Sequence, residues 1–558
     1  FLSLSMYDLV PWYANAIIIC VAIFGYWSLA SSFFPLIFTV CCSGSKPAKK
    51  EFYESLLDGD ELQDDGPIKE SRQYNARATL FSLSIRQGTP LLVGFILIFG
   101  ICWFFSSVCI AFEPVSLSFK GMRDISGEIC NEKLKPCHVY LNVADNTSST
   151  MNVIFHTNYK MSTPRVRIGS TSQASPLEYP FIVDAVGIQM DLEVIRYVYV
   201  VYLKSLDPHR AYYFVAGDGE VAESYSPELK FHTTDSHLGS HPLHFVSGGD
   251  VGITKTSEKL LTLAASKEPS FMVFGGDLSY SNGMRTCYRR WDAWLRQYSK
   301  LAVTPTGFTI PLLTSIGNHE AGGFQMKLKN AAFYPYYFYH QPIDNSGNSL
   351  VRMKQSTALL QTMYHAHDVA GNQLLSLDSD VITSPFGAQA DFIRTQLNQT
   401  RNGRPHAGTV HVNGSMAGVG KSSQLAPKPW AMAVYHMPLY PSVRSFDDKL
   451  SKGLRSAWGP FFDEYHLDVA FENHDHAYKR SYPLNNGKAT SSQLGTTYLG
   501  DGAMGVPARN PAPIHKRDYL VEAERESFFF FMTLTSRNIT IAAINERNVE
   551  FDYHVIAQ

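Results

Sequence analysis

Charge of one sign is the feature that this sequence most plainly lacks. Its 48 Lys and Arg residues against 50 Asp and Glu residues leave a formal net charge of −2 over 558 residues. A chain without a basic excess is not typical of nucleic-acid binding, and one without an acidic tail is not typical of a solvating segment. We therefore expect no nucleic-acid partner. With 45% hydrophobic residues, the chain is long enough for more than one domain with its own core.

Charge is also missing locally, from two long runs. Residues 9–45 and 87–112 contain no Asp, Glu, Lys or Arg. Both exceed the ~20 apolar residues that cross a bilayer, so they predict two transmembrane helices in a membrane anchor at residues 1–113. A buried soluble hairpin is the alternative. A cleaved signal peptide fits poorly because the first run is too long and no basic stretch precedes it, and the sequence does not show whether residues precede Phe1.

The loop between the two apolar runs, at about residues 43–87, is rich in positive charge. Positive loops favour the cytoplasmic side, which places everything after about residue 113 in the lumen or outside the cell. The chain is then an integral membrane protein of the secretory pathway or the cell surface. Four glycosylation sequons beyond the runs agree with that side. The loop carries Lys46, Lys49, Lys50, Lys69, Arg72, Arg77 and Arg86, and the sequons begin at Asn146, Asn398, Asn413 and Asn538.

Cysteine is scarce, with 8 in the whole chain. Cys130 and Cys137 are close enough in sequence to close a small disulfide loop in an oxidising compartment, which leaves Cys287 free, buried or joined to another chain. No second Cys/His cluster of suitable spacing accompanies them, which disfavours a zinc site built from thiols. The other cysteines lie within or beside the apolar runs, at Cys20, Cys41, Cys42, Cys102 and Cys109.

Residues 114–238 contain short β-rich runs separated by polar turns, among them HVYLNVA, NVIFHT, RVRIGS and IRYVYVVYL. Strands at this spacing predict a small β-sandwich. The segment LKSLDPHRAYYFVAG resembles the stretch that precedes a late strand in fibronectin-III-like domains. An antiparallel sheet of another topology is the alternative.

Residues 239–558 show a different pattern, in which apolar strands alternate with helical stretches. LHFVSGGD, FMVFGGD and IPLLTSIGNHE each end in a polar loop, and SEKLLTLAASK and CYRRWDAWLRQYSKLA have helical character. This alternation predicts an α/β domain with functional groups at the carboxyl ends of its strands. The Gly-, Ser- and Pro-rich residues 401–429 predict an inserted surface loop.

Side chains that bind metals follow five of the predicted strands. A single Asp after Gly is usually a turn or helix-capping residue, and a lone histidine is usually a surface or core group. Five such loops in order are hard to explain as turns. They carry Asp250, then Asp277 and Tyr280, then Asn318 and His319, then His436, and finally His474 and His476.

This order resembles the calcineurin-like metallophosphoesterases, and the tyrosine of GDLSY narrows the resemblance to the purple acid phosphatases of the plant-type long form. Their pattern of D-x-G, G-D-x-x-Y, G-N-H-D/E, V-x-x-H and G-H-x-H is matched by DVG, GDLSY, GNHE, AVYH and NHDH. The resemblance covers about residues 119–558 and implies a four-layer α/β/β/α domain. Ala433 replaces the Val of this pattern and Asn473 replaces a Gly, so Asn473 is expected to alter its turn, because glycine adopts φ > 0 more freely.

Carried over residue by residue, the resemblance implies two metal ions bridged by Asp277. Phenolate and carboxylate are hard donors suited to Fe(III), whereas imidazole and amide oxygen suit a divalent ion. Such a pair supplies a metal-bound hydroxide nucleophile. Fe(III) would be held by Asp250, Asp277, Tyr280 and His476, and the second ion, Zn, Mn or Fe, by Asp277, Asn318, His436 and His474.

Two further roles follow from the same resemblance. His319 would be the outer acid that protonates the leaving alkoxide. Arg444 stands near the place where the long enzymes have a pair of histidines, and its guanidinium fork could bind the substrate phosphate. An ordinary solvated loop residue is the alternative for Arg444, because exposed arginines are the norm.

The sequence thus predicts a membrane-anchored acid phosphatase that hydrolyses phosphate monoesters. A nucleotide phosphodiesterase or pyrophosphatase on the same fold is the nearest alternative. A non-catalytic, phosphatase-like subunit of a membrane complex is a third, which the two predicted spans keep open and the full set of ligand residues disfavours. The expected partners are a phosphate ester and the membrane, with a homo-oligomer or a membrane-complex partner left open.

Overall fold

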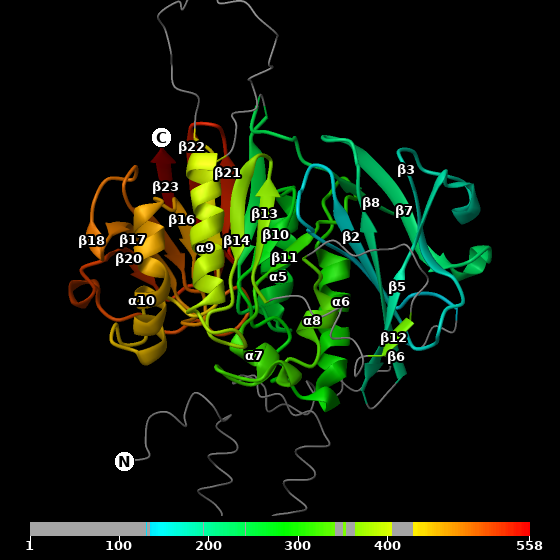
Figure 1. Cartoon of the computed structure of the whole chain (residues 1–558), viewed down its shortest axis with the longest axis horizontal. Coiled ribbons are helices and arrows are strands. Elements are labelled where there is room, and N and C mark those ends of the chain that lie inside the picture. The colour runs from blue at the N-terminus through cyan, green and yellow to red at the C-terminus, as the bar shows by residue number, and fades with distance from the viewer. Residues whose placement is uncertain are drawn as a thin grey trace, which may run out of the picture. The chain divides into compact units, whose positions relative to one another are not determined.

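The computed structural model describes residues 130, 134–192, 195–239, 241–340, 350–352, 363–403 and 428–558 (Figure 1). Among these residues, no helix is both long enough and apolar enough to cross a bilayer. The two apolar runs predicted to span the membrane, residues 9–45 and 87–112, lie outside the described part of the chain. The predicted cytoplasmic loop and most of the predicted insert at 401–429 also lie outside it.

The N-terminal domain consists of two antiparallel sheets. One orders its strands β5 (Val186–Asp191), β6 (Ile195–Leu203), β2 (Met151–Thr157) and β1 (His138–Asn142). The other orders them β4 (Phe181–Asp184), β3 (Pro164–Gly169), β7 (Ala211–Asp218) and β8 (Leu229–His232). Val153 and Tyr199 from the first sheet share one core with Val166 and Phe214 from the second. The domain is β-rich, and its fibronectin-III-like assignment stays a prediction.

Two larger sheets form the rest of the described chain. The first continues from β1 into β11 (Leu312–Thr314), β10 (Met272–Phe274), β9 (Leu243–Gly248), β21 (Phe528–Leu534), β22 (Asn538–Asn545) and β23 (Glu550–Ala557), while β12 (Leu350–Arg352) pairs with β5. The second contains β13 (His365–Val369), β14 (Asn372–Ser376), β15 (Ala431–Val434), β16 (Val469–Phe471), β19 (Thr496–Gly500), β17 (Tyr478–Asn485) and β18 (Lys488–Ala489), with β20 (Leu520–Glu524) paired to β17.

The central strands of both larger sheets are buried on two faces, with helices outside and a sheet-on-sheet core inside (Figure 1). In β10, Val273 enters the core between the sheets, whereas Met272 and Phe274 join the core under the helices, because side chains alternate along a strand. Phe274 packs against Trp294 of α6, and Tyr435, just after β15, packs against Trp458 of α10. This mixed α/β layering agrees with the prediction. The long helices are α5 (Lys255–Ser266), α6 (Tyr288–Leu301), α9 (Ala388–Asn398) and α10 (Lys449–Glu464).

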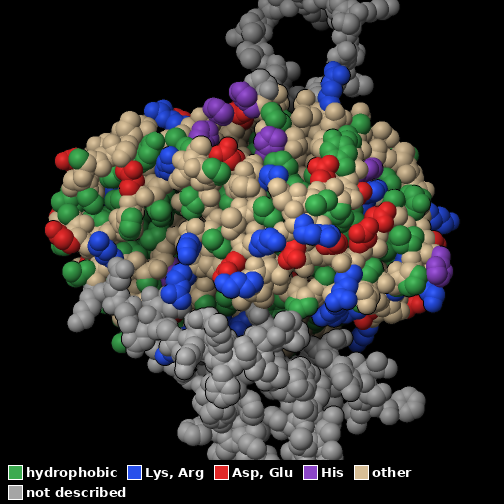
Figure 2. Space-filling view, turned by 180° about the vertical axis from the view of Figure 1, so that it is seen from behind, with side chains coloured by type: hydrophobic (Ala, Val, Ile, Leu, Met, Phe, Trp, Pro, Cys, Tyr) green, Lys and Arg blue, Asp and Glu red, His purple; other side chains and the backbone are tan. Residues whose placement is uncertain are grey.

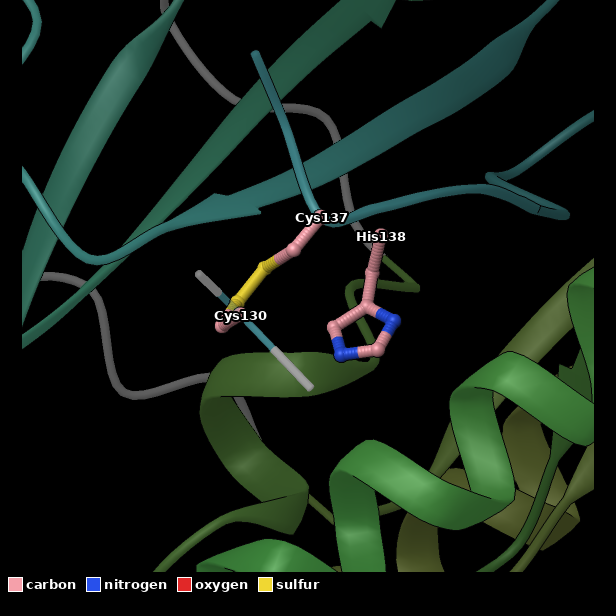
Figure 3. A group of neighbouring side chains, drawn as sticks. All are labelled: Cys130, Cys137 and His138. Carbon is pink, nitrogen blue, oxygen red and sulfur yellow. A yellow bond between two sulfur atoms is a disulfide. The ribbon is translucent and has the colours of Figure 1, made fainter. Parts of the chain in front are cut away.

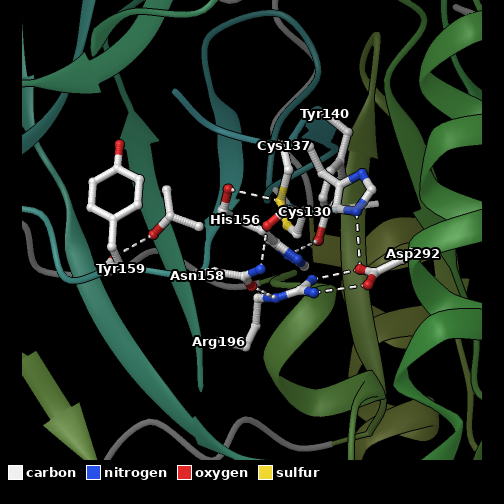
Figure 4. Close-up of a disulfide and its surroundings, with 10 residues drawn as sticks. Cys130, Cys137, Tyr140, His156, Asn158, Tyr159, Arg196 and Asp292 are labelled. Carbon is white, nitrogen blue, oxygen red and sulfur yellow. Dashed lines mark hydrogen bonds and ion pairs between the residues drawn. A yellow bond between two sulfur atoms is a disulfide. The ribbon is translucent and has the colours of Figure 1, made fainter. Parts of the chain in front are cut away.

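A buried polar cluster joins the N-terminal domain to α6 beside the β1–β11 pairing (Figure 4). Nη1 and Nη2 of Arg196 donate to the Asp292 carboxylate, at 2.5 and 2.8 Å, and Nε2 of His138 lies 3.0 Å from the same carboxylate. Next to His138, Cys130 and Cys137 are joined in a disulfide (Figure 3). Elsewhere in the fold, Cys287 is buried and disulfide-bonded, so it is not a free thiol.

Candidate metal centre

The predicted metal ligands all lie in loops that leave the carboxyl ends of neighbouring strands. Strands β9, β10 and β11 run parallel, as do β15 and β16, so their carboxyl ends open at the same edge of each sheet. The ligand residues are distributed as follows: Asp250 after β9, Asp277 and Tyr280 after β10, Asn318 at the start of the short helix α7 (Asn318–Ala321) after β11, His436 after β15, and His474 and His476 after β16.

One set of these side chains converges on Asp250. Nε2 of His476 lies 2.9 Å from Asp250 Oδ1, and the phenol oxygen of Tyr280 lies 3.4 Å from the same carboxylate oxygen. Asp250, Asp277 and His476 place one ligand atom each within 4.8 Å of one another, and all three are buried. This is the set that the sequence assigned to Fe(III).

A second set converges on Nε2 of His436. This nitrogen lies 2.9 Å from Oδ1 of Asn318, 3.0 Å from Nδ1 of His474 and 3.2 Å from Oδ2 of Asp277. Nδ1 of His436 lies 2.8 Å from the Gly275 carbonyl, which can only accept, so Nδ1 carries the proton of the neutral ring. Nε2 of His436 therefore faces two oxygens and a ring nitrogen, and positive charge at this place, as a bound metal ion or as a proton on Nε2, stabilises the arrangement.

The charges of the site lead to the same conclusion. Burial alone lowers the pKa of His436, but the carboxylates of Asp277 and Asp250 outweigh burial and raise this pKa to about 9. Burial alone raises the pKa of Asp277, but His436 and His319 outweigh it and hold this pKa well below its ordinary value. Oδ2 of the buried Asp277 has no hydrogen bond. The residues present therefore fit a pair of cations that share Asp277, the one carboxylate common to both sets.

Five of the predicted ligands adopt left-handed backbone conformations. These residues have φ between 53° and 74°, a region that non-glycine residues occupy at a cost of about 1–2 kcal/mol each. A ladder of backbone hydrogen bonds between the first two loops supports them, from the N–H groups of Asp250 and Gly252 to the carbonyls of Gly276 and Leu278, at 3.0 and 2.9 Å. Strain of this kind collects at functional sites. The five residues are Asp250, Asp277, Tyr280, His474 and His476.

Glu320 is a residue whose role the sequence analysis missed. Its buried carboxylate accepts hydrogen bonds from the backbone N–H groups of Asp277, Leu278 and Gly317, at 2.8, 2.8 and 2.9 Å. Burial, followed by the nearby Asp277 charge, raises its pKa to about 8. Glu320 thus holds the β10 loop against α7. Its position at the third residue of α7 was the signal, because a glutamate there commonly caps the helix start.

Asn473 corrects one expectation. The backbone of Asn473 does not have a positive φ, whereas His474 and His476 in the same loop do. The glycine of the family pattern is therefore not needed at position 473 for a left-handed turn. Its side chain instead fills the space beside three glycines, where a Cβ on Gly275, Gly249 or Gly502 would approach Asn473 to 1.7, 2.2 or 2.8 Å. Nδ2 of Asn473 also donates to the Tyr435 carbonyl at 2.8 Å.

A network of buried charged side chains flanks the loop after β16, which carries His474 and His476. Nζ of Lys479 lies 2.5 Å from both Glu472 and Asp501, and all three side chains are fully buried. Glu472 follows the last residue of β16 and precedes Asn473, and its Oε1 also accepts from the Tyr435 hydroxyl at 2.8 Å. This network ties the β16 loop to the GDGAMG loop after β19.

Arg444, predicted to bind substrate, is engaged with the same loop. Its guanidinium donates to Asp475 Oδ1 at 2.6 Å and to the His474 carbonyl at 3.2 Å, while its backbone N–H donates to Asp475 Oδ2 at 3.0 Å. Asp475 lies between the two histidine ligands and is buried. These contacts connect Arg444 to the loop that carries the two histidine ligands, and its role in binding the substrate phosphate stays a prediction.

His319 lies at the open side of the site. Its side chain is 34% exposed, whereas the side chains of Asp277 and His436 are at most 1% exposed. Its Nε2 lies 3.9 Å from Asp277 Oδ2, its backbone N–H donates to Asp277 Oδ1 at 2.8 Å, and its ring lies 4.5 Å from the Tyr280 ring. Nδ1 of His319 contacts Oδ1 of Asn282, a second residue that the sequence analysis did not find. This contact orients the ring with Nε2 toward the ligands.

The predicted glycosylation sites are not among the residues of the metal centre, and their side chains differ in exposure. Asn398 and Asn538 are exposed, at the end of α9 and at the start of β22. Asn146 is half-buried in a turn, where its Oδ1 accepts from the Ser148 backbone at 2.8 Å. Asn413 lies outside the described residues.

Two protein families match the chain in sequence. The purple acid phosphatase N-terminal domain matches residues 136–233, and the calcineurin-like phosphoesterase family matches residues 231–478. Residues 136–478 thus resemble a purple acid phosphatase N-terminal domain followed by a calcineurin-like phosphoesterase domain. The boundary between the two matches falls at β8, where the sheets of the N-terminal domain end.

Several curated proteins that are similar to this chain are purple acid phosphatases. Purple acid phosphatase 23 of Arabidopsis thaliana is 24% identical over 333 residues, which cover 55% of this chain and 62% of the relative, less than two thirds of its length. Purple acid phosphatase 15 of the same plant is 25% identical, covering 70% of this chain and 69% of the relative. Among solved structures, the purple acid phosphatase PPD1 of yellow lupin superposes with a TM-score of 0.59 at 16% identity, covering 76% of this chain and 75% of that one. The likeness to this structure shows the shared fold.

Proposed function

We propose that the chain is an acid phosphatase that hydrolyses phosphate monoesters with a binuclear metal centre. The observation that carries this proposal is the convergence of two ligand sets on one shared carboxylate, Asp277. The purple acid phosphatase relatives and the lupin structure support a phosphoric monoester hydrolase. Fe(III) at the tyrosine-containing set and Zn, Mn or Fe(II) at the histidine-rich set suit the donors present.

Bound metals of this kind lower the pKa of water and neutralise phosphate oxygens. The protein's own side chains position the ligands and supply the proton. The carboxylates and imidazoles are held in fixed positions by Glu320 and the Lys479 network, which spares the site from reorganising when substrate binds. His319 is the exposed imidazole beside them and donates a proton to the leaving alkoxide. Asn282 holds the ring through Nδ1, with Nε2 on the side of Asp277.

The proposal is tested by metal analysis of the purified full chain together with a substrate screen. We expect two metal ions per chain and faster hydrolysis of p-nitrophenyl phosphate than of bis(p-nitrophenyl) phosphate. A preference for the diester or for a pyrophosphate bond would instead favour the phosphodiesterase reading. A metal-free, inert chain would identify a non-catalytic subunit on a phosphatase fold.

We further propose that residues 1–113 anchor the catalytic domain to a membrane, facing the lumen or the cell exterior. The support is the absence of charge from residues 9–45 and 87–112 and the positive loop between them. In sealed vesicles, added protease should cut the loop at residues 46–86 from the cytoplasmic side and leave residues 134–558 intact. Cleavage of the loop only from the lumenal side would show that the chain has the opposite orientation in the membrane.

A further inference from the structure

A second group of metal-binding side chains lies on the surface where the two domains join. It consists of His209, Asp235 and His241, which we call the linker cluster. His209 is in the turn between β6 and β7 of the N-terminal domain, and the other two are in the linker between β8 and β9. Figure 2 shows one face of the molecule, with histidine side chains gathered beside acidic ones at its upper edge. None of the three belongs to the catalytic centre.

The spacing within the linker cluster suits one metal ion. Nδ1 of His209 lies 3.2 Å from Asp235 Oδ1, and Nδ1 of His241 lies 3.5 Å from Asp235 Oδ2. Two ligands at about 2.0–2.1 Å from a tetrahedral zinc ion are themselves about 3.3 Å apart. The two imidazole rings lie parallel, with centroids 5.2 Å apart and an interplanar angle of 10°. Both nitrogens therefore approach the same carboxylate from rings with a common orientation.

The backbone around the linker cluster is held in place by hydrogen bonds. His209 has a left-handed φ of 51°, and its N–H donates to the Thr234 carbonyl at 3.0 Å. The Thr233 hydroxyl accepts from the Arg210 N–H at 3.0 Å and donates to the Asp207 carbonyl at 2.7 Å. The β6–β7 turn is thus fastened to the first residues of the linker. A site built on it starts from a largely preformed geometry, so little entropy is lost when an ion binds.

The chemistry of the three donors selects the kind of ion. Two imidazoles and one carboxylate are ligands for zinc and similar transition metals, whereas calcium and magnesium prefer sites made of oxygen donors. The histidine side chains are 58% and 65% exposed and Asp235 is 30% exposed, so a solvent molecule can complete the coordination and the ion can exchange.

We propose that His209, Asp235 and His241 bind one exchangeable zinc ion, separate from the catalytic metals, that braces the linker between the domains. The linker leads into β9, whose carboxyl end carries Asp250. An ion here cross-links a turn of the N-terminal domain to the strand that supports the first catalytic ligand. This inference does not depend on the proposed phosphatase activity.

The first test counts zinc on the full chain after dialysis against excess zinc. Wild type should retain one zinc ion per chain more than either Asp235→Asn or His209→Asn. Asparagine is chosen for His209 because it tolerates the left-handed backbone better than alanine. His515→Ala, at an exposed histidine outside both clusters, is the matched control and should retain the wild-type amount. Equal zinc contents in wild type and both cluster variants would overturn the proposal.

The second test locates the ion by chemical footprinting of histidines. In wild type, zinc should slow the reaction of His209 and His241 with diethyl pyrocarbonate several-fold, read by mass spectrometry, and leave His515 unaffected. In Asp235→Asn the protection of both histidines should disappear, while circular dichroism checks that the variant is folded. Protection that persists in Asp235→Asn, or that spreads equally to His515, would show that zinc binds elsewhere.

Discussion

Asp277 is the residue at which the two sets of metal ligands meet. Its Oδ2 is buried without a hydrogen bond, and the positive groups beside it hold its pKa below the ordinary value, in spite of burial. A carboxylate kept ionised in this way attracts cations from both sides. The consequences for metal binding can be tested by replacing one atom.

Asp277→Asn should cost the chain at least one metal ion and lower phosphatase activity by several orders of magnitude. The reason is that the substitution removes the negative charge shared by two cations, which then repel one another without compensation. Metal analysis and hydrolysis of p-nitrophenyl phosphate measure both effects. Asp447→Asn, at an exposed aspartate, is the control. A variant that keeps two metals and full activity would remove Asp277 from the bridging role.

Tyr280→Phe should abolish any visible charge-transfer absorption while the chain stays folded. Burial, followed by the charges of Asp250 and Asp277, raises the pKa of Tyr280 well above its ordinary value, so its phenol ionises only against a bound cation. Absorption spectra of wild type and variant measure this, with Tyr298→Phe as a control at a buried tyrosine outside the centre. A native chain that contains two zinc ions and no iron would contradict the ferric assignment.

At this scale the sequence predicts which residues gather, because the ligands follow apolar strands at their carboxyl ends. It does not predict Asn282 beside His319, since a turn residue at that position has no distinctive pattern. It also misjudges Asn473, whose side chain is accommodated by Gly249, Gly275 and Gly502. Two of these glycines are far from Asn473 in the sequence, so their proximity depends on tertiary packing.

The loops are the elements that give this fold its site, and the loop after β16 is the most heavily supported. Asn473 packs against three glycines, and the Lys479 network holds Glu472, the residue before it. Both supports are buried and both can be tested separately from the metal ligands.

Gly275→Ala should destabilise the chain by about 1–3 kcal/mol, the usual cost of overpacking, because the added methyl would overlap the Asn473 amide. Asn473→Gly alone should also destabilise it, through loss of the bond to the Tyr435 carbonyl and through the space left behind. In the double variant the alanine methyl has room, so the two effects should not add. Urea unfolding of the four chains measures the coupling, and simple additivity would show that the two residues do not touch.

Lys479→Met should lower the free energy of unfolding by about 3–5 kcal/mol, because it leaves the Glu472 and Asp501 charges buried without a cation. Lys488→Met, on the exposed strand β18, should change it by no more than about 0.5 kcal/mol. Denaturant unfolding compares the two. Similar effects from both substitutions would mean that the network is not a source of stability.

Element types were predictable where apolar periodicity was strong, as in α5, α6, β9 and β10. The partners of Lys479 were not, because Asp501 reaches it only when β19 pairs with β17, the strand that carries Lys479. Charge pairs between such distant segments leave no periodic signal in a sequence.

Across the whole molecule, several buried histidines lie at or near the join between the two domains. His367 of β13 contacts the Ala144 carbonyl of the N-terminal domain through Nδ1, and the ring of His340 lies 5.4 Å from it. Burial lowers the pKa of His367 from 6.5 to about 4, despite the opposing effect of the Ala144 contact and of Asp145. The folded chain therefore holds this imidazole neutral where the unfolded chain protonates it.

Stability should therefore fall as the pH drops from about 6.5 to about 4, because in this window the unfolded state binds more protons at His367. His367→Gln should reduce the loss of unfolding free energy between pH 7 and pH 4 by about 3 kcal/mol, at about 1.4 kcal/mol per pKa unit. Denaturant unfolding at both pH values measures this, with the exposed His515→Gln as control. An unchanged pH dependence in His367→Gln would exclude this histidine as a source of acid sensitivity.

The β-rich character of the N-terminal region and the α/β character of the rest were both predictable from the sequence. Their continuity was not, because the pairing of Asn142 with Leu312 joins strands whose patterns give no hint of one another. The predicted membrane spans lie outside the described residues and stay a prediction.

That continuity has a mechanical meaning. Strand β1 lies between β2 and β11, its neighbour Val143 donates to the Leu312 carbonyl at 2.8 Å, and Asp292 of α6 is tied to Arg196 of β6. A sheet that runs unbroken through two domains offers no hinge axis between them. A force applied to the N-terminal sheet therefore reaches β11, the strand that leads to Asn318, through paired strands and buried side chains and not through a flexible linker.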